Sequence, residues 1–213
     1  MDPVVWGPPL WALLHSASLS RTKHAAEEIE KVLDAMEHVL PCVYCRESLK
    51  ILRPVIHKIK FEGTFEKIWA LHNAVSAKLQ IQKGSGAPIT LERARRRWEK
   101  TSEPVSELQL LHALIVTAGN YKKCPDKDKI HWYTVMWEGV ANLCILVPTL
   151  RDLGHQLHGD AQKHRGCALL KSAEIRRRRI MKKRGIDMEK TADGCISTSS
   201  AQIIRRARSK KAI

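Results

Sequence analysis

The sequence lacks the features that mark membrane and secreted proteins. Its longest apolar stretches, near Leu110–Ala118 and Leu143–Val147, fall short of the ~18 uninterrupted apolar residues that a membrane span needs. The first residues, from Met1 to Trp6, have neither the basic nor the apolar region of a secretory signal peptide. Aromatic residues other than tryptophan are also scarce, with two Phe and three Tyr beside six Trp. Because a membrane span and a signal peptide are both missing, we expect a soluble intracellular protein without a membrane-bound part.

Acidic residues are fewer than basic ones, and most of the excess positive charge lies in the C-terminal part of the chain. The chain has 37 Lys and Arg against 22 Asp and Glu, a net charge of +15. From Lys171 to Ile213, 14 Lys and Arg face four acids, so this tail carries +10 and the rest of the chain about +5. A polar, basic stretch is typical of disorder, which we expect over 185–213. The tail is expected to bind nucleic acid or another polyanion, or to be a solvated or targeting segment.

Almost no segment alternates as a strand does, and apolar residues recur at helical spacing. We expect helices over 8–20, 24–40, 43–60, 64–82, 90–100, 105–119 and 131–147. Pro8 and Pro9 fit the start of the first helix better than its interior. The pattern predicts an all-α protein with a four- or five-helix bundle in 1–100, a second helical region in 101–170 and the basic, partly disordered tail in 171–213.

Cys42 and Cys45 form the one pair of cysteines with two-residue spacing. Such a pair can bind a metal, or form a disulfide that passes on oxidising equivalents by thiol exchange. If Pro41 lies in the first turn of a helix, Cys42 lies at the helix N-terminus, where the dipole favours a thiolate. A second CxxC is missing, and a zinc site completed by His57 or His72 still lacks a fourth ligand. A redox disulfide is therefore the favoured interpretation, and no metal is expected.

Four motifs follow one another in the first hundred residues. They are WGPPLWALLH at 6–15, PCVYC at 41–45, WALHNAVSAKL at 69–79, and ITLE at 89–92 leading to WE at 98–99. Their order and spacing resemble the Erv/ALR family of FAD-linked sulfhydryl oxidases. The first motif is most similar to the compact members carried by large cytoplasmic DNA viruses. The resemblance covers residues 4–100, less than half of the chain.

The resemblance implies a bundle of four or five helices around the isoalloxazine ring of FAD, and a homodimer. Family members oxidise protein dithiols to disulfides and pass the electrons through FAD to dioxygen, which becomes hydrogen peroxide. The substrate would be a protein dithiol, met directly or through a thioredoxin-like relay protein. The expected location is the host cytoplasm or the virion, where such an enzyme would form disulfides that the host cytosol does not favour.

The resemblance also implies roles for individual residues. Cys45 matches the thiolate next to the flavin, and Cys42 matches the interchange cysteine that meets the substrate. Trp11 and His15 match the cofactor-contacting pair of the first motif and share one helical face. The full set of implied cofactor-binding residues is Trp6, Gly7, Trp11, His15, Cys45, His72, Asn73, Val75, Ser76, Lys78, Leu79 and Trp98. In this set, Lys78 is expected to reach a phosphate as a point charge.

Two residues depart from the family pattern. Ser76 stands where the family usually has Asn, and Ser20 stands where an aromatic residue is common. A serine has less reach and one donor fewer than an asparagine, so we expect weaker FAD binding. Neither change touches the dithiol.

The second helical region echoes the first. LQLLH at 108–112 is similar to WALLH at 11–15, and Val147-Pro148 is similar to Leu40-Pro41 without the cysteines that follow. These echoes indicate a degenerate second bundle packed as a pseudo-dimer.

The remaining cysteines lack the two-residue spacing. Cys124, Cys144 and Cys167 are interpreted as buried or incidental thiols, although Cys124 lies in an electropositive loop. Cys195, in the tail, is the candidate for a relay thiol. A different class of function also fits the composition: a basic nucleic-acid or virion-interaction structural protein with an inactive bundle.

Overall fold

The computed structural model describes residues 3–84, 87–99, 105–119, 127–164 and 167–185, and all regular structure there is helical. The helices are α1 (Pro3–Ser18), α2 (Lys23–Val39), α3 (Val43–His57), α4 (Thr64–Lys83), α5 (Leu91–Glu99), α6 (Glu107–Gly119), α7 (Lys127–Leu146), the 3-10 turn η1 (Pro148–Leu150), α8 (Arg151–Lys163) and α9 (Cys167–Lys183). The prediction of an all-α protein is confirmed. Within these ranges no helix is long and apolar enough to cross a membrane.

The first helix begins earlier than the sequence predicted. α1 starts at Pro3, so Pro8 and Pro9 lie inside the helix rather than at its start, and the expectation for the two prolines was wrong. Neither proline can donate a backbone hydrogen bond to the preceding turn. The buried Trp6 lies one turn before the buried Leu10, on the same face of the helix. Burial of this large ring favours the helical conformation upstream of the prolines.

The break between α2 and α3 places the cysteine pair. α2 ends at Val39, and Cys42 is the N-cap of α3. The expected position of Cys42 at a helix N-terminus is confirmed, with Pro41 just before the helix rather than in its first turn. The backbone N–H of Cys45 points to Cys42 Sγ at 3.2 Å, as in a side-chain cap.

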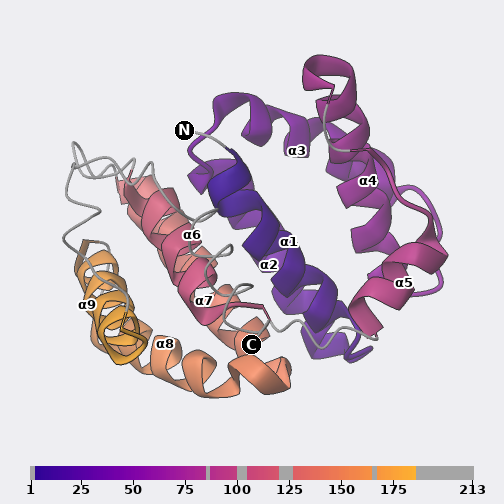
Figure 1. The fold of residues 1–213 in the computed structure, drawn as a ribbon. Helices are drawn as coiled ribbons and strands as arrows, with labels where there is room; N and C mark the ends of the chain where they lie inside the picture. Colours follow the sequence, from indigo (N-terminus) through magenta and orange to yellow (C-terminus); the bar gives the residue numbers. More distant parts are fainter. Residues whose placement is uncertain (1–2, 85–86, 100–104, 120–126, 165–166, 186–213) are drawn as a thin grey trace.

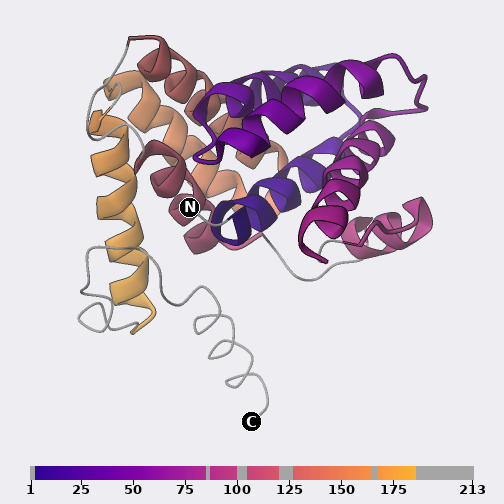
Figure 2. The same cartoon turned by 90° about the horizontal axis from the view of Figure 1, so that it is seen from above.

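α1 and α2 lie in the middle of the molecule. α3, α4 and α5 lie on one side of them, and α6, α7, α8 and α9 on the other (Figures 1 and 2). The helices of the second side pack on the middle pair, where α2 crosses α7 and α6 lies against α1. At the crossing of α2 and α7 the backbones are so close that a Cβ on Gly139 would lie 2.7 Å from Cγ2 of Val32. Beside this crossing, the buried carboxylate of Glu28 accepts hydrogen bonds from Asn142 at 3.0 Å and Lys31 at 2.6 Å.

The two residues in contact at this crossing occupy matching positions relative to the Leu40-Pro41 and Val147-Pro148 echoes. Val32 stands nine residues before Pro41, and Gly139 stands nine residues before Pro148. Two copies of one helix that are related by a twofold axis cross at the same residue of each copy. α6 lies against α1 as α7 lies against α2 (Figure 1). The degenerate second bundle stays a prediction from the sequence.

The basic tail begins inside a helix. α9 extends to Lys183, beyond the boundary expected at 171, and Ala173 and Met181 are buried. Arg176 on α9 donates to Asp160 on α8 at 2.7 Å. The first part of the tail therefore belongs to the packed helices. The disorder expected over 185–213 falls, from residue 186 on, outside the described residues.

Candidate functional site

Cys42 and Cys45 form a disulfide at the start of α3, with their Cα atoms 5.2 Å apart. Both cysteines are half-buried and pack against the core. Tyr44, between them, is 81% exposed. The disulfide therefore lies where the core meets solvent, and a thiol from outside and a group within the bundle can approach it from different sides.

Four rings from three of the predicted motifs form one cluster. Trp11 of α1 stacks on His72 of α4, with ring centroids 4.3 Å apart and planes 5° apart. His15 of α1 stacks on Trp98 of α5, at 5.0 Å and 9°. The cluster joins residues that the sequence separates widely, and it offers flat surfaces of the kind on which an aromatic cofactor stacks.

The two histidines of the cluster are held neutral. Nε2 of His15 and Nδ1 of His72 lie 3.0 Å apart. Burial, then the neighbouring charges of His72 and Arg97, lowers the pKa of His15 to about 3. Burial, then Arg97, lowers the pKa of His72 to about 4. Near pH 7 the pair therefore acts as two neutral rings joined by one shared hydrogen bond, not as a cationic site.

One polar atom of this cluster, and one elsewhere on α1, lack hydrogen-bond partners among the described residues. Nδ1 of His15 and Nε1 of Trp6 are buried and have no hydrogen-bond partner among the described residues. An unsatisfied buried polar group costs about 1–3 kcal/mol. Gly7 is buried, yet a Cβ added there would meet no atom within 4 Å. The unsatisfied Nδ1 of His15 beside the stacked rings, and the free space at Gly7 one turn before Trp11, fit a flat ligand with polar edges, so these residues suit a flavin.

Asn73 holds the segment that leads into α5. Its side-chain amide donates to the carbonyl of Ile89 at 2.7 Å and accepts from the N–H of Ile89 at 3.1 Å. Nε1 of Trp69 donates to the same carbonyl at 2.9 Å. Ile89 leads into α5, which carries Trp98. Asn73 thus positions the ring of Trp98 by holding the segment before α5.

Lys78 connects α4 to the cysteine pair. Its ammonium donates to Oγ of Ser48, which in turn donates to the carbonyl of Tyr44 at 2.5 Å. Ser48 lies one turn after Cys45 on α3. The contact therefore ties the start of α3 to the C-terminal half of α4. The other predicted residues of α4, namely Val75, Ser76 and Leu79, are half-buried.

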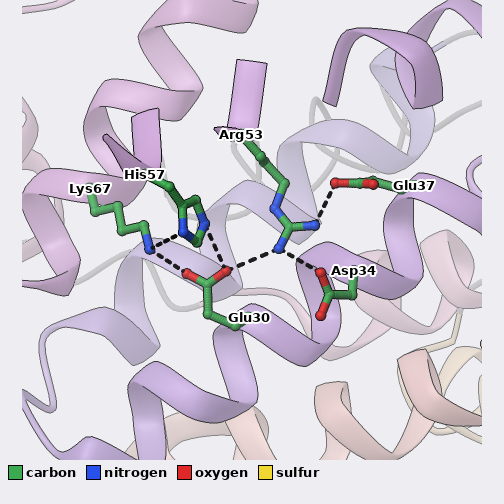
Figure 3. Close-up of polar contacts among 6 residues, drawn as sticks. All are labelled: Glu30, Asp34, Glu37, Arg53, His57 and Lys67. Atoms are coloured by element: carbon green, nitrogen blue, oxygen red, sulfur yellow. Dashed lines mark hydrogen bonds and ion pairs between the residues drawn. The ribbon is translucent and has the colours of Figure 1, made fainter. Parts of the chain in front are cut away.

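An ion-pair network orients α3 against α2 and α4 (Figure 3). The buried guanidinium of Arg53 pairs with Glu30 at 3.0 Å, Asp34 at 2.6 Å and Glu37 at 2.5 Å, all on α2. Lys67 of α4 reaches Glu30 at 2.8 Å. Burial alone would raise the pKa of Glu30, but the hydrogen bond and charge of Lys67, helped by Arg53, outweigh it and lower this pKa. The carboxylate is therefore ionised and binds the three helices together.

The zinc interpretation finds no support in the described residues. Within them, no group of three or more His, Cys, Asp or Glu is placed to hold a metal. His57 lies in the network of Figure 3, with Nε2 3.2 Å from Glu30. Cys144 is a free, buried thiol, and burial raises its pKa. Cys124 and Cys195 lie outside the described residues.

Three residues near the site were missed in the sequence. Phe65 lies 5.5 Å from the ring of His15, and the guanidinium of Arg97 lies 5.3 Å over Trp98. Ser48 links Lys78 to α3. The sequence spacing could have identified Phe65, which is seven residues before His72 and so shares its helical face. Arg97 was hidden within the run Arg95–Arg97.

No family model, curated protein or solved structure matches this chain. The Erv/ALR resemblance therefore depends on the motifs of the sequence.

Proposed function

We propose that the protein is an FAD-dependent sulfhydryl oxidase of the Erv/ALR type, which forms disulfides in protein dithiols and reduces dioxygen to hydrogen peroxide. The main observation in support is that separate motifs converge. Trp11, His15, His72 and Trp98 form one ring cluster, and the single CxxC forms a disulfide in the adjoining helix. We propose virion protein maturation in the host cytoplasm as the setting, as the resemblance implies.

The chemistry at the disulfide follows from its position. A substrate thiolate attacks Sγ of Cys42, the Cys42–Cys45 bond breaks, and Cys45 leaves as a thiolate. The second substrate thiolate then attacks the mixed disulfide, so the substrate leaves oxidised and Cys42 leaves as a thiolate. The N–H of Cys45, 3.2 Å from Cys42 Sγ, and the N-terminus of α3 stabilise negative charge on Cys42.

FAD, when bound, supplies the two-electron acceptor that returns the dithiol to a disulfide. Two kinds of residue would hold FAD: flat rings for its ring system and basic side chains for its phosphates. Trp11, Trp98 and the neutral rings of His15 and His72 present flat surfaces, and Nδ1 of His15 is available to a polar ring edge. Lys78, and Arg97 beside Trp98, supply positive charge suited to phosphates.

Absorbance and turnover test the proposal. The purified chain, reconstituted with FAD, should show a bound flavin spectrum and should consume oxygen when given dithiothreitol. His72→Ala should lower flavin retention, because a stacked ring and the bond to His15 are lost together. A preparation that binds no FAD under these conditions would overturn the proposal.

We also propose a homodimer, as the resemblance implies. α6 and α7 cover α1 and α2 within one chain, so a second copy would have to use another surface (Figure 1). The partner dithiol protein would be the substrate itself or a thioredoxin-like relay. The mass of the protein in solution tests whether it is a dimer.

The alternative, a nucleic-acid or virion-interaction protein, gains support from α9. Arg178, Arg179, Lys182 and Lys183 are exposed on this helix. Such a row of cations suits contact with a polyanion. Polyanion binding and thiol oxidation are compatible in one molecule, because α9 and α3 lie on opposite sides of the fold (Figure 1).

A further inference from the structure

The outer face of α3 carries a row of exposed apolar side chains. Tyr44, Ile51, Val55 and Ile59, the last just beyond the helix, are exposed by 81, 66, 55 and 50%. Their spacings of seven, four and four residues place them on one side of the helix. We call these four residues the α3 stripe.

The stripe is not the core face of the helix. Leu49, Arg53 and Ile56 are the buried residues that turn α3 toward the rest of the bundle. A surface helix usually shows polar residues on the opposite face. Exposed apolar side chains gathered in that position are typical of an interaction surface.

The place of the stripe indicates what binds to it. Tyr44 lies between Cys42 and Cys45, so the stripe begins at the disulfide and runs away from it. From Tyr44 to Val55 the helix rises by about 16 Å. A partner laid along this length has one end next to Cys42.

The size of the stripe indicates a short-lived contact. Stable interfaces use about 20–30 residues on each side, and the stripe offers four. A second copy held permanently would need more surface, whereas a substrate has to leave after each turnover. Exposed Lys58 and Lys60 outnumber the exposed Glu62 at the far end, which favours a partner with acidic residues there.

We propose that the α3 stripe is the docking surface for the reduced protein substrate, which places an amphipathic segment along α3 and its dithiol at Cys42. The proposal rests on the thiol-oxidase function proposed above. The segment is a helix of about three turns with an apolar face and acidic residues at the end away from its thiols, because this length spans the ~16 Å of the stripe.

Two synthetic peptides test the proposal. Both carry a CxxC dithiol, and one continues into an amphipathic helix with Leu on one face and Glu at its far end. The other has the same composition in scrambled order. The enzyme variant is Ile51→Ser/Val55→Ser, which touches neither the disulfide nor the ring cluster. Ile175→Ser is the matched control, since Ile175 is an exposed isoleucine on α9.

The wild type should oxidise the amphipathic peptide with a kcat/KM at least tenfold above that of the scrambled one. The double variant should lose this preference through a higher KM and keep the wild-type rate with dithiothreitol, while Ile175→Ser should change nothing. Equal use of the two peptides by the wild type, or an unchanged preference in the double variant, would overturn the docking proposal.

Two other outcomes would point elsewhere. If the wild type is a dimer that the double variant converts to a monomer, the stripe holds a second copy and the docking proposal is wrong. If the FAD-loaded wild type also fails to oxidise dithiothreitol, the proposed oxidase function is wrong. The docking proposal, which rests on that function, is then wrong too. The dithiothreitol assay thus separates the two failures.

Discussion

Nε2 of His15 lies 3.0 Å from Nδ1 of His72, and each of these rings stacks on a tryptophan. The shared hydrogen bond needs one proton between the two nitrogens, so the pair is complete when both rings are neutral. A second proton would place charge in a buried site beside Arg97. Burial and the charge of Arg97 therefore keep both rings neutral, which is the state that the shared hydrogen bond needs.

The first prediction concerns stability and pH. The folded-state pKa values of His15 and His72, about 3 and about 4, lie below the unfolded value of about 6.5. The unfolded chain therefore binds more protons between these values, and stability should fall as pH drops from about 6.5 toward 4. His72→Phe keeps a ring and removes one proton site, so it should reduce the slope by up to about 1.4 kcal/mol per pH unit. Urea unfolding from pH 7 to pH 4.5 measures it.

The control for this prediction is His158→Gln, which changes an exposed histidine on α8. It should leave the slope as in the wild type. An equal slope in His72→Phe and the wild type would show that His72 does not titrate as its burial implies.

The second prediction concerns the cysteines. Cys45→Ser should abolish oxygen-dependent oxidation of dithiothreitol while FAD stays bound. Cys42→Ser should be equally inactive, but it leaves Cys45 as a free thiolate, which should add a long-wavelength absorption band to the flavin spectrum. Absorbance and oxygen consumption on the same samples measure both effects. Full activity in either variant would remove the pair from the mechanism.

The other four cysteines provide the control. Cys144→Ala and serine variants of Cys124, Cys167 and Cys195 should keep the activity with dithiothreitol, because none has a neighbour at two-residue spacing. Cys195 has a separate readout. If Cys195→Ser slows oxidation of a protein substrate and spares the small dithiol, this residue is a relay thiol and its dispensability is disproved.

Local sequence signals predicted much of the fold. The apolar period gave the first seven helices, and the Pro41 break gave the N-terminal position of Cys42 on α3. The extension of α1 through Pro8 and Pro9 could not be predicted, because it depends on the tertiary packing that buries Trp6 in the core. Tertiary packing outweighed the local preference of proline there.

The site was less accessible to prediction than the helices. The motifs named Trp11, His15 and His72, and the structure brings all three together. The role of Asn73 depends on how the chain returns past Ile89, which no periodicity encodes. The packing of α9 was hidden for a different reason: a run of four arginines masks the spacing of its buried residues.

The third prediction tests the packing of α7 against α8. A Cβ on Gly154 would lie 2.7 Å from the backbone nitrogen of Ile145 and 2.8 Å from the carbonyl oxygen of Ala141. Backbone atoms of a packed helix cannot move aside cheaply, so Gly154→Ala should cost about 2–3 kcal/mol of unfolding free energy. Chemical denaturation measures the loss.

Gly159→Ala, on the same helix, is the matched control. A Cβ there would meet nothing within 4 Å, and alanine favours the helix over glycine by about 0.5–1 kcal/mol. This variant should be slightly more stable than the wild type. If both variants shift stability in the same direction, the close approach of α7 and α8 is not as described.

The fourth prediction separates the charge of α9 from that of the segment that follows it. Residues 171–185 contain eight Lys or Arg and one acid, whereas residues 186–213 contain six and three. Most of the +10 charge of the tail therefore lies on or next to a packed helix. Removal of 186–213 should keep the flavin, the dithiothreitol activity and most of the affinity for DNA. Removal of 171–213 also deletes the buried Ala173 and Met181, and it should lower the thermal midpoint.

A charge variant isolates the polyanion contact from the fold. Arg178→Gln/Arg179→Gln/Lys182→Gln changes exposed side chains alone, so the thermal midpoint and the flavin content should stay as in the wild type. Each phosphate contact that is lost should reduce the slope of log affinity against log salt by about 0.9 on duplex DNA. Because no motif that reads bases is visible, unrelated duplexes should bind equally well. If the triple variant keeps the wild-type slope while removal of 186–213 abolishes binding, the contact belongs to the last residues and not to α9.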